Sequence, residues 1–255
     1  MSDRRLVTPF FLDHPSLPHR GLAGDWLNDV TLHDGTVMER LAAVHAPLAA
    51  EVERTIVSGD RPVSIAGDCC AVIPVVAGLQ GVGLAPRLLW LDAHGDFNTP
   101  ATSPSRFIGG MPLAMLVGRG PQDLLDALGM RKLPERDVVL CEARDLDPLE
   151  RVAVEGSRVH HVRAFERLFE ERLDGRPLHV HLDVDVLSLD DAPAVLYPVP
   201  GGPRVAALRE LGRRLAAMET PVSVSMTTWV FDRDADGGTA AACLDALDGL
   251  LGKER

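Results

Sequence analysis

Short apolar runs and amphipathic segments alternate along this chain, an order typical of an α/β protein with a mostly parallel sheet. Between residues 36 and 57, apolar side chains recur every three or four positions, which predicts a helix that is bent at Pro47. The same spacing predicts further helices after Cys70 through about Leu79, near 121–128, at about 204–218 and at about 239–251.

The continuous apolar runs predict strands, because strands buried on both faces of a parallel sheet lack polar alternation. Segment 62–66 is expected to be the first central strand, and glycine- and proline-rich loops are predicted over 95–112 and 197–202. Since no repeat, low-complexity tract or linker divides the chain, one domain over residues 1–255 is expected. The other predicted strands are 88–91, 137–141, a weaker one near 157–162, 178–185 and 222–226.

Composition favours a globular protein that acts on a small molecule. The 255 residues are 46% hydrophobic and 25% charged, which allows a substantial core. A net charge of −11 argues against nucleic acid or an anionic membrane as partner. Without a membrane-length apolar run or a signal-peptide pattern, a cytoplasmic location is expected. The four cysteines are expected to be reduced thiols, since they are too few for a disulfide scaffold.

Two strand ends carry candidate metal ligands. The run 88–91 leads directly into Asp92, His94 and Asp96, and the run beginning at residue 178 leads into Asp183 and Asp185. Alternate residues of an extended segment point to one face, so each set can converge on one site. One such triplet also occurs in ordinary polar loops, where the carboxylates cap or face solvent. Two of them at strand ends favour a metal site, because ligands gather beyond the carboxyl ends of parallel strands.

These motifs resemble those of the ureohydrolase superfamily, which includes arginases, agmatinases and formimidoylglutamases. Residues 92–96 and 181–185 match two of its metal-binding motifs, 66–70 occupies the place of the first motif, and 144–148 is similar to a motif on the substrate side. The resemblance covers about residues 60–250. It implies an arginase-like, three-layer α/β/α fold around a mostly parallel sheet.

The resemblance also implies a pair of divalent metal ions and hydrolysis of a C–N bond by a metal-activated hydroxide. Manganese is the ion that it favours, and Asp92 and Asp183 would bridge the two ions. Asp96, His94 and Asp185 would carry the catalytic roles, with Asp96 passing a proton to the departing nitrogen. The implied metal ligands are Cys69, Asp92, His94, Asp96, Asp183 and Asp185, and Asn98 and Asp147 would orient the substrate.

The chain departs from the family pattern at three positions. Cys69 stands where the first motif has a histidine, and a thiolate favours zinc, iron, cobalt or nickel over manganese. Gly109 replaces a proton-shuttling histidine, and Thr228 lies opposite a glutamate that pairs with the substrate guanidinium in arginases. Arginine is therefore a poor candidate substrate. With the cysteine in its first motif and the run 95–100 in its second, the chain is similar to the hydroxyguanidine-cleaving, N-hydroxyarginine hydrolase-like members.

Two other functions stay open at this point. Cys69 could act as a metal-independent nucleophile with His94 as its base, because it precedes a predicted helix. Alternatively, the changes at Gly109 and Thr228 could leave a catalytically silent, ligand-binding relative. His181 could be a further ligand or proton carrier, although a buried histidine paired with a backbone carbonyl is favoured. The family also implies a homo-oligomer, commonly a trimer or hexamer.

Overall fold

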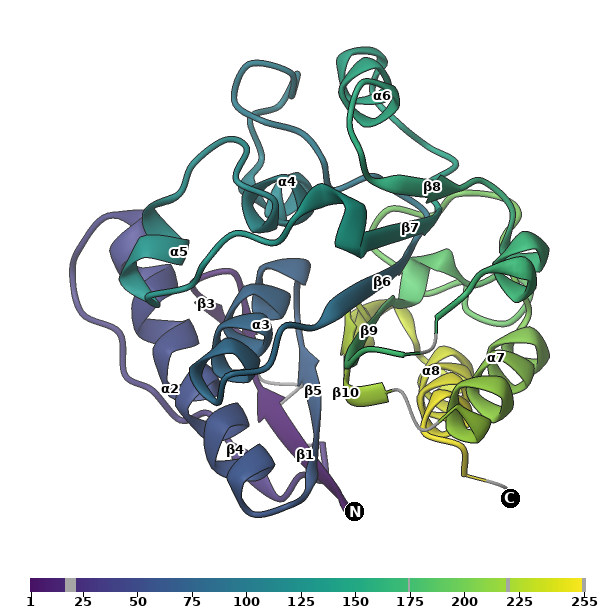
Figure 1. The fold of residues 1–255 in the computed structure, drawn as a ribbon, viewed down its shortest axis with the longest axis horizontal. Helices are drawn as coiled ribbons and strands as arrows, with labels where there is room; N and C mark the ends of the chain where they lie inside the picture. The colour runs from purple at the N-terminus through teal and green to yellow at the C-terminus, as the bar shows by residue number, and fades with distance from the viewer. Residues whose placement is uncertain (17–21, 174, 219–220, 254–255) are drawn as a thin grey trace.

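A computed structural model describes residues 1–16, 22–173, 175–218 and 221–253. Its centre is an eight-stranded sheet in the order β4-β1-β5-β10-β9-β6-β7-β8, and every described pairing within it is parallel (Figure 1). The fold is therefore the expected α/β class. The strands of this sheet are β1 (Asp3–Thr8), β4 (Trp26–Leu27), β5 (Arg61–Ala66), β6 (Arg87–Asp92), β7 (Val138–Glu142), β8 (His160–Val162), β9 (Leu178–Asp183) and β10 (Pro221–Thr227).

Helices cover both faces of the sheet and complete three layers. Alternation along β6 shows how the layers form, because Leu89 and Leu91 join one core cluster while Leu88 and Trp90 join another. The Leu89 cluster includes α7 (Val205–Ala217) and α8 (Gly238–Leu250). The opposite face packs against helices that include α2 (Val37–Val57), α3 (Val72–Gly81), α4 (Pro112–Leu116) and α5 (Asp123–Ala127).

Several predicted elements differ from the observed ones. The strand 62–66 is preceded by β1, which lies beside it at Asp3–Thr8 and begins with three polar residues that hide the strand signal. Pro47 lies inside α2 without ending it. Helices α4 and α6 (Pro148–Glu155) were not predicted, since five and eight residues are too few to show helical periodicity. The small antiparallel pair β2 (Phe10–Phe11) and β3 (His14–Pro15) was also missed.

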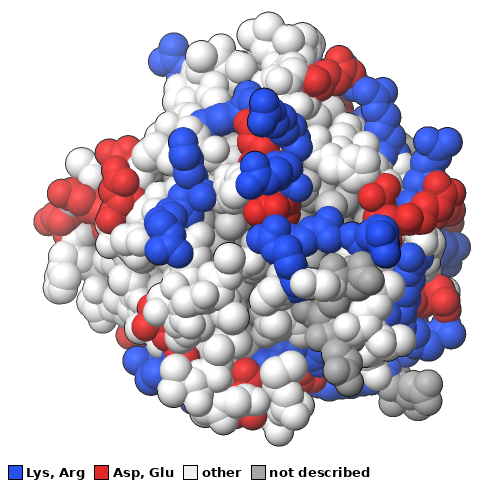
Figure 2. Space-filling view, viewed as in Figure 1, with Lys and Arg blue, Asp and Glu red and all other residues white. Residues whose placement is uncertain are grey.

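The surface in the view of Figure 1 mixes charges of both signs. Figure 2 shows Lys and Arg side chains across this face with Asp and Glu side chains between them. Some of these charges are paired, as in the contact of Arg176 with Asp137 at 2.7 Å. Among the described residues, no helix has the length and apolar character needed to span a membrane.

Candidate metal centre

The candidate site lies at the carboxyl ends of four adjacent strands, β5, β10, β9 and β6. Parallel pairing brings these ends to one edge of the sheet, so motifs more than a hundred residues apart meet there. All six side chains that the sequence indicated as metal ligands lie in this cluster, and five of them are buried. His94 is the exception, with a quarter of its side chain exposed.

A turn closed by the side chain of Asp92, at the end of β6, positions the candidate ligands Asp92, His94 and Asp96. Strand β6 ends at Asp92, whose Oδ1 accepts a hydrogen bond of 2.7 Å from the backbone N–H of His94. Its Oδ2 accepts one of 2.8 Å from the indole of Trp90. Asp96 has a left-handed φ of 46°, which turns the chain back toward the cluster. The expectation of one extended segment over 92–96 was therefore wrong, because the Asp92 carboxylate closes a turn.

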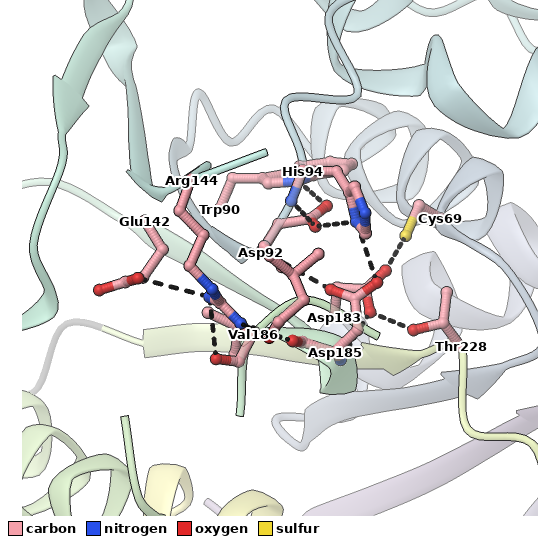
Figure 3. A network of polar contacts seen from close by, with 12 residues as sticks. Cys69, Trp90, Asp92, His94, Glu142, Arg144, Asp183, Asp185, Val186 and Thr228 are labelled. Atoms are coloured by element: carbon pink, nitrogen blue, oxygen red, sulfur yellow. Dashed lines mark hydrogen bonds and ion pairs between the residues drawn. The ribbon is translucent and has the colours of Figure 1, made fainter. Parts of the chain in front are cut away.

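The end of β9 uses the same device. The strand stops at Asp183, not at Asp185, and Asp183 Oδ1 accepts a 3.0 Å hydrogen bond from the N–H of Asp185. A 3₁₀ turn over Val184–Val186 follows. Arg144 holds this turn from outside, since its guanidinium donates to the carbonyls of Asp185 and Val186 at 3.2 Å (Figure 3).

Cys69 faces the β9 end of the cluster from the loop after β5. Asp68 caps the 3₁₀ turn Cys69–Ala71 by accepting from the N–H of Cys70 at 2.9 Å. The thiol of Cys69 donates to Asp183 Oδ2 at 2.8 Å and lies 3.1 Å from the hydroxyl of Thr227. Thr228, with a φ of 69°, donates its hydroxyl to the other oxygen of Asp183. The Asp183 carboxylate thus joins the thiol to the end of β10 (Figure 3).

Burial and mutual repulsion act on the four carboxyl groups. Burial is the largest cause that raises the pKa of Asp96, and the charges of Asp92 and Asp183 raise it further. The pKa of Asp183 is raised by burial and then by Asp185 and Asp92, and the pKa of Asp185 by burial and then by Asp92. Burial also raises the pKa of Asp92, but its contacts with His94 outweigh burial and lower it.

His94 is the one cation in this group of carboxylates. Its Nδ1 lies 3.1 Å from Asp185 Oδ2 and 3.5 Å from Asp92 Oδ1. Burial by itself lowers the pKa of His94, but hydrogen bonds to Asp185 and Asp92 outweigh burial and raise the pKa to about 12. The imidazole must lose a proton before it can bind a metal ion, so an ion would replace this proton as the counter-charge.

The donor set fits divalent metal ions. The Oδ2 atom of Asp96 is buried and has no hydrogen-bond partner among the described residues. Buried carboxylates at this density are costly unless positive charge neutralises them. Three groups each bring their ligand atoms within 4.8 Å of one another, and these are Cys69, Asp92 and Asp96, then Asp92, His94 and Asp185, then Cys69, His181 and Asp183.

All of the six candidate ligands except Asp92 line a cavity of about 450 Å³. The two residues expected to face the substrate line its wall and contact each other, since the amide of Asn98 donates to Asp147 at 2.9 Å. Two more acidic groups line the cavity: Asp145, which belongs to the substrate-side motif 144–148 but was given no role, and Glu150, which sequence reasoning missed. Burial is the main cause that raises the pKa of Glu150 to about 7. The sequence pattern that could have revealed Glu150 is the spacing Asp147-x-x-Glu150, which forms a capping box at the start of α6.

An aromatic wall occupies the region where a proton-shuttling histidine was expected and Gly109 stands instead. Gly109 lines the cavity, and a Cβ added to it would lie 2.4 Å from the ring of Phe107. That ring stacks on Phe11 at 6.3 Å between centroids and meets the ring of Tyr197 edge-on at 6.4 Å. Packed aromatic rings therefore fill the space that a longer side chain at Gly109 would need.

His181 lies deeper in the same cluster and is completely buried. Its Nδ1 lies 2.9 Å from the hydroxyl of Ser225, and its ring packs on Trp90 with 4.1 Å between ring centroids. The expected backbone-carbonyl partner was wrong, because the register of β9 against β10 places Ser225 directly opposite His181.

Comparison with known proteins places this geometry in a family. A model described as the arginase family matches residues 13–248. The chain belongs to the arginase family. Arginase of Bacillus subtilis (strain 168) is 36% identical to it over 177 residues, which cover 65% of this chain and 60% of that protein. Arginase of Bacillus caldovelox is 34% identical over 180 residues, with the same two shares. The matched part spans about three fifths of the length of these relatives.

Solved arginase-family structures share the fold. The crystal structure of arginase from Bacillus subtilis superposes with a TM-score of 0.86 at 26% identity, covering 100% of this chain and 99% of that chain. The structure of agmatine ureohydrolase from Thermoplasma volcanium has a TM-score of 0.65 at 18% identity, covering 96% of this chain and 77% of that chain. The three-layer α/β/α architecture predicted from the motifs is therefore confirmed.

Proposed function

We propose that this arginase-family protein is a metal-dependent hydrolase that cleaves a C–N bond of a small guanidino, hydroxyguanidino, amidino or formimino compound. The observation that carries the proposal is the convergence of four carboxylates, an imidazole and a thiol in one cluster, in which every member except Asp92 lines the same cavity. The crystallised and curated relatives named above are arginases, and the agmatine ureohydrolase shares their fold. Family membership and donor chemistry thus support the same reaction class.

The proposed metal ligands are the six side chains of the cluster. Bound divalent ions would lower the pKa of a water molecule, so that hydroxide is present near neutral pH. Asp96 would hold the proton of that nucleophile and pass it to the departing nitrogen, because its buried Oδ2 is not hydrogen bonded to any of the described residues. His94 would be the ligand nearest the substrate, since it lines the cavity and is the most exposed of the six side chains.

The cavity wall favours a substrate with a cationic or hydrogen-bond-donating end away from the reacting carbon. Asp145, Asp147 and Glu150 all line this wall. Thr228 also lines the cavity, and it presents a hydroxyl, which donates to Asp183, where arginases would place a carboxylate for the guanidinium. An N-hydroxyguanidine is less basic than a guanidine and needs that counter-charge less. We therefore place hydroxyguanidino compounds ahead of arginine as substrates.

Manganese is the ion proposed from the family, while the thiol of Cys69 shifts the preference toward zinc, cobalt, iron or nickel. A small-molecule substrate, a homo-oligomer of the trimeric or hexameric kind, and a cytoplasmic location stay predictions.

The thiol-hydrolase alternative is disfavoured by the surroundings of Cys69. Burial raises the pKa of this thiol well above its usual value, and the charges of Asp183, Asp96 and Asp92 raise it further. A nucleophilic cysteine needs the opposite environment, which stabilises a thiolate. The thiol is also a hydrogen-bond donor to Asp183, so its proton is engaged in the cluster.

The function is tested with protein purified without a metal-affinity tag. Chelator-treated protein is reconstituted separately with Mn²⁺, Co²⁺, Zn²⁺, Ni²⁺ and Fe²⁺, and release of urea or ammonia is measured on guanidino, N-hydroxyguanidino, amidino and formimino compounds. We expect turnover that chelation abolishes and metal restores, and that survives Cys69→Ser with reduced metal affinity. Metal-loaded protein that turns over none of these compounds would instead support a ligand-binding relative. Metal-independent turnover that Cys69→Ser abolishes would support the thiol.

A further inference from the structure

A continuous line of hydrogen bonds links two histidines of β9 to two serines of β10. His179 pairs in register with Ser223, and His181 with Ser225. Nδ1 of His179 lies 2.8 Å from Ser223 Oγ, its Nε2 lies 3.0 Å from Ser225 Oγ, and that hydroxyl lies 2.9 Å from Nδ1 of His181. All four side chains are completely buried. Nε2 of His181, at the site end of the line, has no hydrogen-bond partner among the described residues.

The line of bonds can run in two directions, which differ at Nε2 of His181. Both rings are neutral, because they are buried and neither is hydrogen bonded to a carboxylate, so each carries one N–H. In the first direction Nδ1–H of His181 donates to Ser225, that hydroxyl donates to Nε2 of His179, and Nδ1–H of His179 donates to Ser223. In the reverse direction Nε2 of His181 carries the hydrogen. Four hydrogens share three bonds, so each direction leaves one donor over, and only the first leaves a lone pair on Nε2 of His181, which binding of a metal ion there requires.

His181 lies close to two other donor residues. A ring nitrogen of His181, Sγ of Cys69 and a carboxylate oxygen of Asp183 lie within 4.8 Å of one another, and all three residues are buried. Because Nδ1 is hydrogen bonded to Ser225, Nε2 is the nitrogen that is free to bind an ion. The ring of Trp90, 4.1 Å away between centroids, packs against the imidazole and limits its movement. The hydroxyl of Ser225 holds the other ring nitrogen, Nδ1, as outer partners do for histidines that bind metals.

We propose that His181 is a further metal ligand, through Nε2, at the Cys69 end of the site. The inference rests on the proposed metal-dependent function and adds a residue outside the six assigned above. Cys69 replaces an imidazole in the motif after β5, and His181 supplies one from β9, two strands away in the sheet. With a nitrogen, a sulfur and an oxygen donor, this end of the site selects Zn²⁺ or Co²⁺ over Mn²⁺.

Cobalt titration of metal-free, full-length protein tests the assignment. We expect one tight Co²⁺ equivalent with a thiolate-to-cobalt absorption band in the near ultraviolet, which Cys69→Ser removes. His181→Leu should weaken this first equivalent by more than the roughly 10–100-fold that loss of an outer hydrogen-bonding partner costs. The matched control is His179→Leu, a buried histidine of the same strand face and hydrogen-bonded line whose two ring nitrogens are both paired. The Co²⁺ affinity of His179→Leu should fall by no more than this 10–100-fold, and its cobalt spectrum should match that of wild type.

The other outcomes are distinguishable. Wild-type affinity and spectrum in His181→Leu, or equal losses in both leucine variants, would overturn the ligand assignment and leave metal-dependent hydrolysis intact. Wild-type protein that binds no Co²⁺, Zn²⁺ or Mn²⁺ would overturn the proposed function as well. If His181→Leu does not fold, X-ray absorption of wild type with one Zn²⁺ equivalent decides. A zinc ion bound by both a sulfur and an imidazole supports His181 as the ligand, because the other candidate imidazole, His94, groups with Asp92 and Asp185 and not with Cys69. A zinc ion that lacks either the sulfur or the imidazole overturns the assignment.

Discussion

At the scale of single residues, the site contains buried carboxylates whose negative charges destabilise the metal-free folded state. Asp96 shows this most clearly, because it is buried, its Oδ2 has no hydrogen-bond partner in the described part of the chain, and it lies among other carboxylates. Burial followed by the repulsion of Asp92 and Asp183 raises its pKa, so its ionised form destabilises the metal-free fold. The same negative charge would attract a divalent ion. Asp96 therefore opposes folding without metal and favours binding of metal.

Asp96→Asn separates these two effects. Because the folded state raises the pKa of Asp96, the destabilisation by its charge appears as pH rises above the unfolded value near 3.9. At pH 7 we expect the metal-free variant to be more stable than metal-free wild type by on the order of 1–3 kcal/mol, measured by urea unfolding. Metal affinity and turnover should both fall steeply. A metal-free variant that is less stable than wild type would contradict the repulsion argument.

His45 gives an acid dependence that is independent of the site. This residue of α2 is completely buried and neither ring nitrogen has a partner among the described residues, and burial lowers its pKa to about 3. Between pH 6.5 and 3 the unfolded chain binds a proton that the folded chain does not, so acidification destabilises the fold. His45→Leu should remove up to about 1.4 kcal/mol of this loss per pH unit. Urea unfolding at pH 7, 6 and 5 measures how the unfolding free energy changes with pH. An equal pH dependence in the variant and in wild type would refute the role of His45.

At the scale of elements, the site depends on how strands end. Asp92 and Asp183 each terminate a strand by accepting the N–H two residues ahead, and the turns that follow bring the later ligands back to the cluster. The loop after β5 relies on close backbone contact, since the N–H of Gly67 donates to the carbonyl of Phe10 at 3.0 Å. Packing at that contact positions both Cys69 and Phe11 at the cavity.

Gly67→Ala tests this contact. A Cβ at Gly67 would lie 2.4 Å from the carbonyl oxygen of Phe10 and 3.1 Å from Cα of Phe11, so backbone must move. We expect a loss of about 1–3 kcal/mol in unfolding free energy, together with weaker metal binding because Cys69 shifts. The control is Gly110→Ala, whose Cβ would have no heavy atom within 4 Å. Equal stability of the two variants, measured by thermal or urea unfolding, would argue against the close approach.

At the scale of the whole molecule, the sequence predicts the layers and the motif positions better than the details that join them. Apolar runs identify the central strands because burial on both faces excludes polar residues. Strand β1 was missed because Arg4 and Arg5 interrupt its apolar pattern, and α6 because a helix of eight residues shows little periodicity. The pairing of His181 with Ser225 depends on the register of β9 against β10, which no local pattern in either strand reveals.

The proposed metal centre joins four strand ends, so its occupancy should stabilise the molecule as a whole. An ion that binds only the folded state at a free concentration 100 times its dissociation constant adds about 2.7 kcal/mol. For a chain of this size that corresponds to a rise in Tm of roughly 5–10 °C. Scanning calorimetry should show this loss after chelation and its recovery with metal, whereas Asp96→Asn should recover little. If the Tm of wild type does not change when metal is removed and added back, the carboxylate cluster folds without the ions. That result would remove the main physical argument for a metal centre.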